Sequence, residues 1–403
     1  MTGAPARPDG SDAGMAGDGR RAYLDHAATA PLRPEALEAM LPFLTGAFAN
    51  PSGAHAESRR ARVALDDARD RIAELLGAGP GDVVLTSGGT EADDLAVQGG
   101  WDAAPAGGPG PGAVVCSAME HHAVLEACRA LARRTGADLR LVPSDPWGVV
   151  DLDALAAACT PEVRLVSVMA VNNELGTVQP LDAVAEVVRQ RSAGAVLHTD
   201  AVQAVPWLDA AAATAPADLV TVSAHKFGGP KGSGALVLRH GASVRPRIAG
   251  GGQERGRRSG TPNVAGAVGT ASALAATCEE RAAQVVRVGA LRDRLGDGLA
   301  ARVPELVESG RRADRVAGIV HVRLAGIEAE ALVVLLDGAG IAASAGAACS
   351  SGAVEASHVL RSMGLDAAEA SSGIRFSLGV TTTGEDVDRA LSRVPSAVER
   401  LRH

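Results

Sequence analysis

AVLHTDAVQAVPWLDAAAATAPADLVTVSAHK, residues 195–226, contains two short apolar runs that each lead into a polar side chain. The first run, 195–199, ends at Asp200, and the second, 219–222, ends shortly before Lys226. Short, uninterrupted apolar runs are typical of strands that are buried on both faces of a parallel sheet. We therefore expect Asp200 and Lys226 to follow two successive strands of such a sheet.

The same pattern continues on both sides of this stretch. Further apolar runs at 83–86, 113–116, 164–171 and 235–238 alternate with amphipathic helical stretches. This alternation predicts an α/β fold with a mostly parallel sheet covered by helices. Ligands bind at the carboxyl edge of such sheets. The polar residues that follow the predicted strands, and that we expect to converge there, are Thr90, His121, Asn173, Asp200 and Lys226.

The pattern changes after about residue 280. Residues 279–303 and 328–340 read as helices, 318–324 and 374–378 as strands, and 382–401 as a capped helix. We expect a large domain over 35–280 and a smaller α+β domain over 281–403. Residues 21–34 are predicted to pack with the small domain, and the Gly-, Ala- and Pro-rich residues 1–20 to form a disordered tail.

Composition excludes several classes of protein. The net charge of −8 argues against direct nucleic-acid binding, because such binding needs a basic face. No apolar run is long enough to span a membrane. The five cysteines form no C-x-x-C pair and predict neither a disulfide framework nor a metal site. The predicted location is the cytoplasm.

Lysine is almost absent from the chain. Only Lys226 and Lys231 occur among 39 basic residues, and both lie in SAHKFGGPKG. A lysine amine can lose its proton and form a Schiff base, which arginine cannot do. An Asp after one strand and a Lys after the next suit the two ends of a pyridoxal ring. Codon bias, a surface lysine and a helix-capping aspartate are the alternatives.

Four other features suggest chemistry, and each has an ordinary structural alternative. The turn 87–90 could bind an anion such as a cofactor phosphate, or be a plain tight turn. His121 could stack on the ring and move protons, or be structural. Arg375 could bind a substrate carboxylate, or lie on the surface. Cys349, in a loop of small residues, could be a nucleophilic thiolate, whereas the other four cysteines look like packing residues.

Ten motifs follow one another from about Tyr23 to the C-terminus: YLDHAATAP, ANPSGAH, TSGGTEADDLAV, EHHAVL, VNNELGTVQP, HTDAVQAV, SAHKFGGPKG, GGGQERGRRSGT, ASAGAACSS and SGIRFSLG. In this order they resemble the motifs of cysteine desulfurases of the NifS/IscS type, which belong to fold-type I and aminotransferase class V. The family implies a large domain with a mostly parallel seven-stranded sheet, a smaller α+β domain, and pyridoxal 5′-phosphate as cofactor.

The resemblance also implies a role for each matching residue. Lys226 resembles the Schiff-base lysine, Cys349 the persulfide-forming cysteine, and His121 the stacking histidine. The remaining matches are Asp200 at the ring nitrogen, Gln203 and Asn173 near the ring oxygen and substrate, Gly89, Thr90, Ser223 and His225 at the phosphate, and Arg375 at the substrate carboxylate. Thr261 matches a threonine that reaches the partner subunit's phosphate, so a homodimer with shared active sites is implied.

The implied reaction removes sulfur from L-cysteine, leaving L-alanine and a persulfide on Cys349 for a sulfur-acceptor protein. Iron–sulfur scaffolds, tRNA thiolation, DNA phosphorothioation and thio-metabolite pathways all remain open as destinations. Three departures from the family pattern are Ala30, Asp94 and the pair Ala347–Ala348. A selenocysteine lyase, an aminotransferase-like enzyme and a non-catalytic docking platform are the alternative functions.

Overall fold

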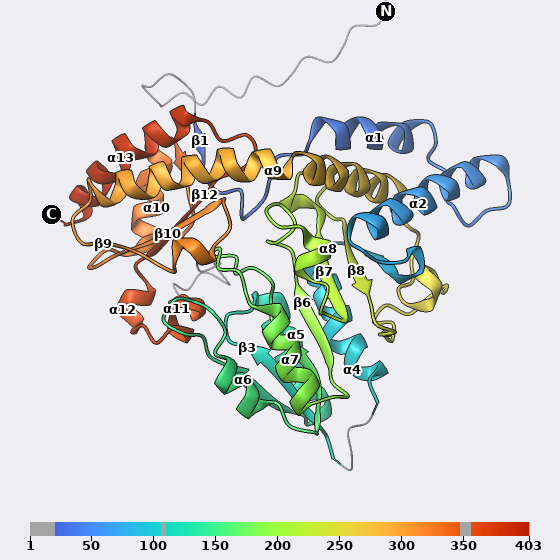
Figure 1. Ribbon diagram of the computed structural model, residues 1–403. Coiled ribbons are helices and arrows are strands. Elements are labelled where there is room, and N and C mark those ends of the chain that lie inside the picture. Colours follow the sequence, from blue (N-terminus) through green and yellow to red (C-terminus); the bar gives the residue numbers. More distant parts are fainter. Residues whose placement is uncertain (1–20, 106–109, 347–355, 403) are drawn as a thin grey trace, which may run out of the picture.

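The structure, a computed structural model, describes residues 21–105, 110–346 and 356–402. Its centre is a seven-stranded sheet with the order β2-β8-β7-β6-β5-β3-β4 (Figure 1). These strands are β2 Val83–Thr86, β8 Gly234–Leu238, β7 Leu219–Ser223, β6 Val196–Asp200, β5 Val163–Ser167, β3 Ala113–Ser117 and β4 Asp138–Val142. The strands from β7 to β4 run parallel, and β8 is antiparallel to both β7 and β2. The predicted mostly parallel sheet is confirmed.

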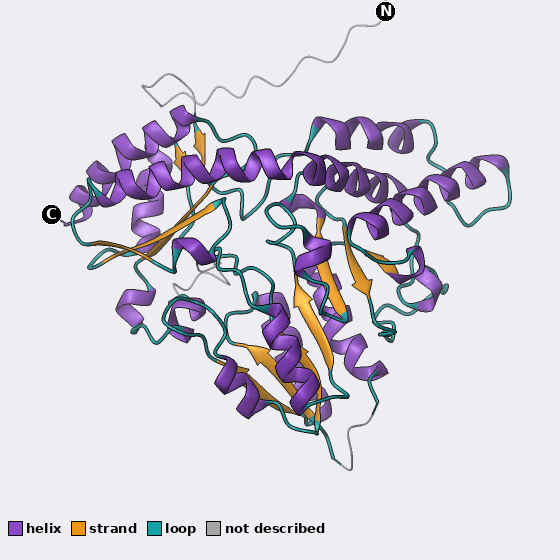
Figure 2. Cartoon of the chain, in the orientation of Figure 1, coloured by secondary structure: helices purple, strands orange, loops and turns teal. Residues whose placement is uncertain are grey.

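Helices cover both faces of this sheet (Figure 2). In β3, Val114 and Cys116 join an apolar cluster with α5 His122–Thr135, whereas Val115 joins the main core with α7 Leu181–Arg191. This alternation explains why the central strands read as unbroken apolar runs. The other helical elements of this part are α3 Gly89–Asp94, a π-helical segment Leu95–Gly99, α4 Gly100–Ala103, α6 Leu152–Ala158, α8 Ala210–Ala213, and the 3₁₀ turns Pro80–Asp82, Ala224–Lys226 and Glu254–Gly256.

A second, three-stranded antiparallel sheet has the order β12-β10-β9. Its strands are β12 Gly373–Ser377, β10 Ile319–Leu324 and β9 Leu306–Glu308. The helical elements near it are α10 Ala329–Gly338, α11 His358–Ser362, α12 Ala367–Ala370, α13 Gly384–Arg402 and the 3₁₀ turn Arg312–Asp314. The strands expected at 318–324 and 374–378 and the helices expected at 328–340 and 382–401 are all present.

The long helix α9, Val264–Ala300, runs past both sheets (Figure 1). It packs against α1 Pro34–Thr45 and α2 Ala56–Leu75 at one end and against α13 at the other. Because α9 continues without a break through residue 280, the domain boundary placed there stays a prediction. None of the helices in the described ranges is both long and apolar enough to cross a membrane.

The N-terminal segment connects the two sheets. β1, Ala22–Tyr23, pairs in parallel with β11, Ile341–Ala342, beside the small sheet. A few residues later the backbone N–H of Ala30 donates to the carbonyl of His225, which follows β7 of the large sheet. Residues 25–30 therefore lie between the two parts of the chain. The predicted tail, residues 1–20, lies outside the described residues.

Gly234 allows β8 to approach the turn that follows β2. A Cβ atom at this position would lie 2.7 Å from the carbonyl oxygen of Val222 and 2.8 Å from the carbonyl carbon of Gly88. Both atoms are backbone, so neither can rotate away. We predict that Gly234→Ala destabilises the protein by about 1–3 kcal/mol, the usual cost of overpacking. Urea unfolding at fixed protein concentration measures this change.

Gly194→Ala is the matched control, because a Cβ there would meet no atom within 4 Å. It should leave the unfolding midpoint nearly unchanged. Equal stability of the Gly234 and Gly194 variants would contradict the close approach of β8 to Gly88.

Candidate active site

A cavity of about 430 Å³ opens at the carboxyl ends of the central strands. Ten of the twelve residues that the sequence singled out line it together: Gly89, Thr90, His121, Asn173, Asp200, Gln203, Ser223, His225, Lys226 and Arg375. They come from both sheets and from segments almost 300 residues apart. The expected convergence of these residues at this edge of the sheet is therefore present.

Lys226 ends the 3₁₀ turn that directly follows β7. Its Nζ donates to two backbone carbonyls of the N-terminal segment, those of Ala27 at 2.6 Å and Ala28 at 2.9 Å. Burial, reinforced by the positive charge of Arg375, lowers the pKa of the Lys226 amine to about 8. A substantial fraction of this amine is therefore neutral, and so nucleophilic, near physiological pH.

Asp200 is the last residue of β6, the strand adjacent to β7. Its Oδ1 accepts a hydrogen bond from the backbone N–H of Val202 at 2.8 Å. Burial raises the pKa of Asp200 to about 6, against the opposing effects of that hydrogen bond and of Lys226. A buried carboxylate gains from a cationic partner in the cavity, which is what a protonated pyridine nitrogen supplies.

Two more carboxyls lie close to Asp200, and both are buried. Burial, together with the charge of Asp200, raises the pKa of Asp93 and of Glu120 well above the ordinary range. Glu120 Oε1 accepts from the backbone N–H of Met169, while Glu120 Oε2 and Asp93 Oδ1 have no hydrogen-bond partner among the described residues. Burial and repulsion from Asp200 therefore favour the protonated forms of Asp93 and Glu120.

His121 is held in one orientation by the start of α5. As the N-cap residue, its Nδ1 accepts a hydrogen bond from the backbone N–H of Ala123 at 3.1 Å. The proton of the neutral ring is therefore on Nε2. Burial and the nearby charge of Lys226 lower the pKa of His121 to about 4, so the ring is neutral at physiological pH.

The turn after β2 has the features of an anion site. Gly88 has φ of +151°, and a Cβ at Gly89 would lie 3.3 Å from the Cβ of Ser223 and from Cγ2 of Val202. The hydroxyls of Thr90 and Ser223 have no hydrogen-bond partner among the described residues and are free to donate. The ring of His225 lies beside them in the cavity, with its Nδ1 3.2 Å from Thr29 Oγ1. Backbone N–H groups, hydroxyls and an imidazole together suit a phosphate.

Arg375, in β12, brings a positive charge to the cavity. Its Nη1 donates to the carbonyl of Asn173 at 2.9 Å, and its Nη2 donates to Asp25 Oδ1 at 2.8 Å. Its Nε is buried and has no partner among the described residues. The guanidinium is therefore fixed in place with donors unused, which fits the recognition of a carboxylate.

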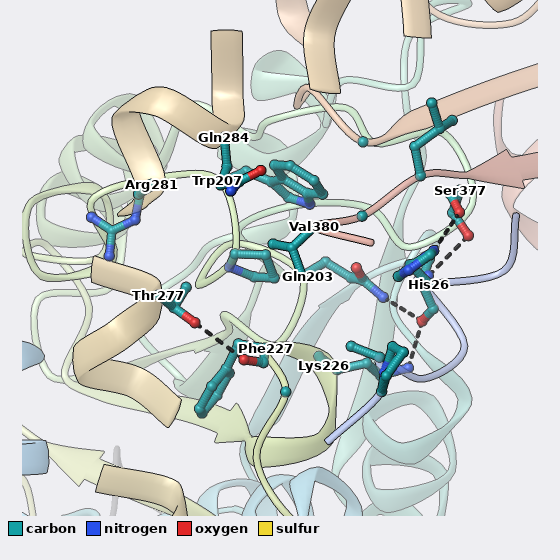
Figure 3. A pocket seen from close by; sticks show the side chains of 18 of the residues that line it. His26, Gln203, Trp207, Lys226, Phe227, Thr277, Arg281, Gln284, Ser377 and Val380 are labelled. Carbon is teal, nitrogen blue, oxygen red and sulfur yellow. Dashed lines mark hydrogen bonds between the residues drawn. The ribbon is translucent and has the colours of Figure 1, made fainter. Parts of the chain in front are cut away.

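Gln203 lines both this cavity and a smaller one of about 40 Å³, large enough for a water molecule or two, as do Ala27 and Lys226 (Figure 3). Its Nε2 donates to the carbonyl of Ala27 at 2.8 Å, the same oxygen that accepts from Lys226. Trp207, Phe227 and Val380 also line the smaller cavity. These apolar side chains contribute to the burial that lowers the pKa of Lys226.

Sequence reasoning missed several residues that line the larger cavity, among them Asp93, His122, Met169, Glu174, Ser344 and His358. Glu174 directly follows Asn173 in VNNELG, so this motif could have identified it as a site residue. His358 enters through α11, and its Nε2 contacts the carbonyl of Glu120 at 2.8 Å, a contact that no local pattern indicates. Within the described ranges, no group of three or more His, Cys, Asp or Glu side chains is arranged to hold a metal ion.

Two predicted residues are not in this cavity. Thr261 is exposed and lines a different pocket, together with Ser87, Arg258 and Asn263. Cys349 falls in 347–355, outside the described residues, although Gly346 before that segment and His358 after it both line the cavity. The other four cysteines are free thiols, and Cys116, Cys128 and Cys159 are buried.

Comparison with known proteins gives consistent matches over nearly the whole chain. A curated protein named cysteine desulfurase, from Cereibacter sphaeroides, is 46% identical over 95% of this chain and 97% of its own length. A solved structure described as a NifS-like protein has 33% identity and a TM-score of 0.87, covering 94% of this chain and all of that one. Another, SspA in complex with cysteine, has 31% identity and a TM-score of 0.75 over 90% of this chain and 99% of that one.

The family model described as aminotransferase class-V matches residues 22–390, which include every described residue that lines the cavity. The chain belongs to the class-V aminotransferase family.

Proposed function

We propose that this protein is a pyridoxal 5′-phosphate-dependent cysteine desulfurase, which converts L-cysteine to L-alanine and retains the sulfur as a persulfide on Cys349. The observation that carries the proposal is that Asp200, at the end of β6, and Lys226, in the turn after the adjacent β7, line one cavity with the turn after β2 and the guanidinium of Arg375. The names of the relatives, and the cysteine bound to one solved structure, support the choice of substrate.

The residues of the cavity fit the cofactor. Lys226 would hold its aldehyde carbon, Asp200 would pair with the ring nitrogen, and His121 would cover a ring face. Gln203 and Asn173 would contact the ring oxygen. The phosphate would be held by Gly89, Thr90, Ser223 and His225. When bound, the cofactor supplies an electron sink for the substrate's Cα.

The protein's own side chains orient the substrate and move its protons. Unused donors of Arg375 bind the cysteine carboxylate, and Asn173 lies beside it, since its carbonyl accepts from Arg375. The amine of Lys226, with its pKa of about 8, takes the Cα proton. The depressed pKa of His121 keeps its ring neutral, and because Nδ1 accepts from Ala123, the Nε2–H is left to donate a hydrogen bond to the substrate or the cofactor.

Cys349 then receives the sulfur. Its thiolate attacks the sulfur of the bound cysteine, so that an S–S bond forms as the C–S bond breaks. The electron pair of the C–S bond stays with the substrate carbon, which takes up a proton and leaves as alanine. Gly346, before this segment in the sequence, and His358, after it, both line the cavity, which supports this role.

The partners we propose follow from the same chemistry. A persulfide is a form of sulfur for transfer, so we expect a sulfur-acceptor protein, such as an iron–sulfur cluster scaffold or a thiolation enzyme. We also propose a homodimer in which the exposed Thr261 reaches the partner subunit's phosphate site. A reducing compartment preserves free thiols, and we propose the cytoplasm.

The two lysines provide a direct test of cofactor attachment. We expect the purified protein with added pyridoxal 5′-phosphate to be yellow, and borohydride to fix the cofactor on the Lys226 peptide, as seen by mass spectrometry. Lys226→Ala should abolish both signals, whereas Lys231→Ala, at the exposed second lysine, should keep them. A colourless wild-type protein would rule out the proposal.

The rate of cofactor capture should depend on pH in a defined direction. Only the neutral amine of Lys226 attacks an aldehyde, so the capture rate of the cofactor-free protein should rise with pH and level off above about 8. Because the charge of Arg375 lowers this pKa, Arg375→Gln should move the inflection to higher pH. Stopped-flow absorbance measures both curves, and a shift to lower pH would contradict the electrostatic assignment.

Cys349→Ala tests the sulfur-accepting role. With L-cysteine, the wild-type protein should release alanine and carry one extra sulfur on the Cys349 peptide. The variant should lose alanine release by roughly 100-fold or more, the scale expected for loss of a nucleophile. Cys278→Ala, at the partly exposed packing cysteine, should retain activity. Unchanged alanine release by Cys349→Ala would disprove the assignment.

A further inference from the structure

We infer that His122 binds the side chain of the substrate: its imidazole accepts a hydrogen bond from the thiol of the bound cysteine, and so favours cysteine over amino acids with an apolar side chain. The inference rests on the proposed function and adds a specificity-determining residue to it. His122 is the first residue of α5, directly after His121, and it lines the large cavity. The proposed contacts with the cofactor do not involve it.

Hydrogen bonding distinguishes His122 from the other three histidines of the cavity. The rings of His121, His225 and His358 each have a partner in the protein, at distances of 3.1, 3.2 and 2.8 Å respectively. The ring of His122 has no hydrogen-bond partner among the described residues. A neutral imidazole carries one donor nitrogen and one acceptor nitrogen. Both nitrogens of His122 are therefore left for a ligand in the cavity.

His358 packs against the ring of His122. The two ring centroids lie 4.6 Å apart, with 52° between the ring planes. His358 is itself held at the start of α11, because its Nε2 donates to the carbonyl of Glu120 at 2.8 Å. Two flat rings at this distance are in packing contact. The ring of His122 is therefore oriented by a neighbour that uses neither of its nitrogens.

The ring of His122 is neutral at physiological pH. Burial, reinforced by His358, lowers the pKa of His122 below the ordinary histidine value, and Arg129 acts in the same direction. The charges of Glu174 and Glu126 favour the protonated form but do not outweigh burial. His122 therefore presents an unprotonated nitrogen, which accepts a hydrogen bond from a thiol but not from a methyl group.

The groups that bind the rest of the substrate direct its side chain towards this part of the cavity. The Cα of cysteine carries a proton that faces Lys226, an amino nitrogen that joins the cofactor, a carboxylate at Arg375, and the CH₂SH group. Glu174 lies beside the carboxylate site, since the carbonyl of the preceding Asn173 accepts from Arg375, and the charge of Glu174 acts on His122. The part of the cavity wall that remains for the CH₂SH group contains His122.

A structural role is the competing explanation for His122. In that case its ring only covers the start of α5 and packs against His358. Such a role requires a flat ring but no ring nitrogen, so phenylalanine would fulfil it. Binding of the thiol requires the acceptor nitrogen. The two explanations therefore differ in what happens when the ring is kept and its nitrogens are removed.

The test compares His122→Phe with His122→Gln in a Cys349→Ala background, as full-length, cofactor-loaded protein. This background binds L-cysteine without sulfur transfer, so the spectral change at equilibrium gives a dissociation constant. L-α-Aminobutyrate, which has a methyl group in place of the thiol, is the matched ligand. His122→Phe should weaken cysteine binding about fivefold, the scale of one hydrogen bond, without weakening the binding of L-α-aminobutyrate. His122→Gln should keep most of the preference, because an amide oxygen accepts from a thiol.

The pH dependence of this preference gives a second readout. With His122 present, the ratio of the two affinities should fall as pH drops through the pKa of His122, because a protonated imidazole accepts no hydrogen bond. In His122→Phe the ratio should be independent of pH. Groups that affect both ligands equally cancel in the ratio.

Binding of L-α-aminobutyrate shows in the same samples whether the site of each variant is folded. Unchanged cysteine binding in His122→Phe would overturn the inference, as would equal weakening of both ligands. A wild-type, cofactor-loaded protein that shows no spectral change with either amino acid would instead overturn the proposed function.

Discussion

The placement of a buried amine beside a buried carboxylate is the constraint on which the rest of this structure depends. Asp200 ends β6 level with Thr221 of β7, and Lys226 follows β7 by one short turn. Burial opposes the charged form of each group, while each charge favours the other. The parallel register, the apolar residues of both strands and the small cavity next to Lys226 keep these two groups in a site from which water is partly excluded. The anion-binding turn and Arg375 are then arranged around them.

The sequence predicted the central strands because burial on both faces makes them uniformly apolar. β4, Asp138–Val142, was missed for the opposite reason: it is an edge strand, with Asp138 and Leu141 exposed, and its residues do not form an apolar run. β9 is only three residues long and gives too little signal. The helical stretch that starts with α3 becomes π-helical over Leu95–Gly99, and the sequence does not indicate this because such a change of hydrogen-bond register leaves its period nearly unaltered.

Site residues that follow strands were visible in the sequence, because strand ends of a parallel sheet meet at one edge. Residues that reach the cavity by tertiary packing were not. Asp25 pairs with Arg375 across 350 positions, and Glu174 binds Ser357 across 183. Such partners have no fixed spacing, so neither periodicity nor a local motif identifies them. Thr261 is a different case, since the proposed role requires a second chain.

The N-terminal segment holds the site residues from the large sheet and Arg375 from the small sheet in fixed relative positions. Within five residues, Asp25 binds Arg375, the carbonyl of Ala27 accepts from both Gln203 and Lys226, and Thr29 contacts His225. The carbonyls of Ala27 and Ala28 favour the protonated amine, yet the pKa of Lys226 is lowered to about 8, so burial and Arg375 outweigh them. The same segment that holds the amine in place therefore leaves it reactive, and it couples that amine to the arginine that orients the substrate.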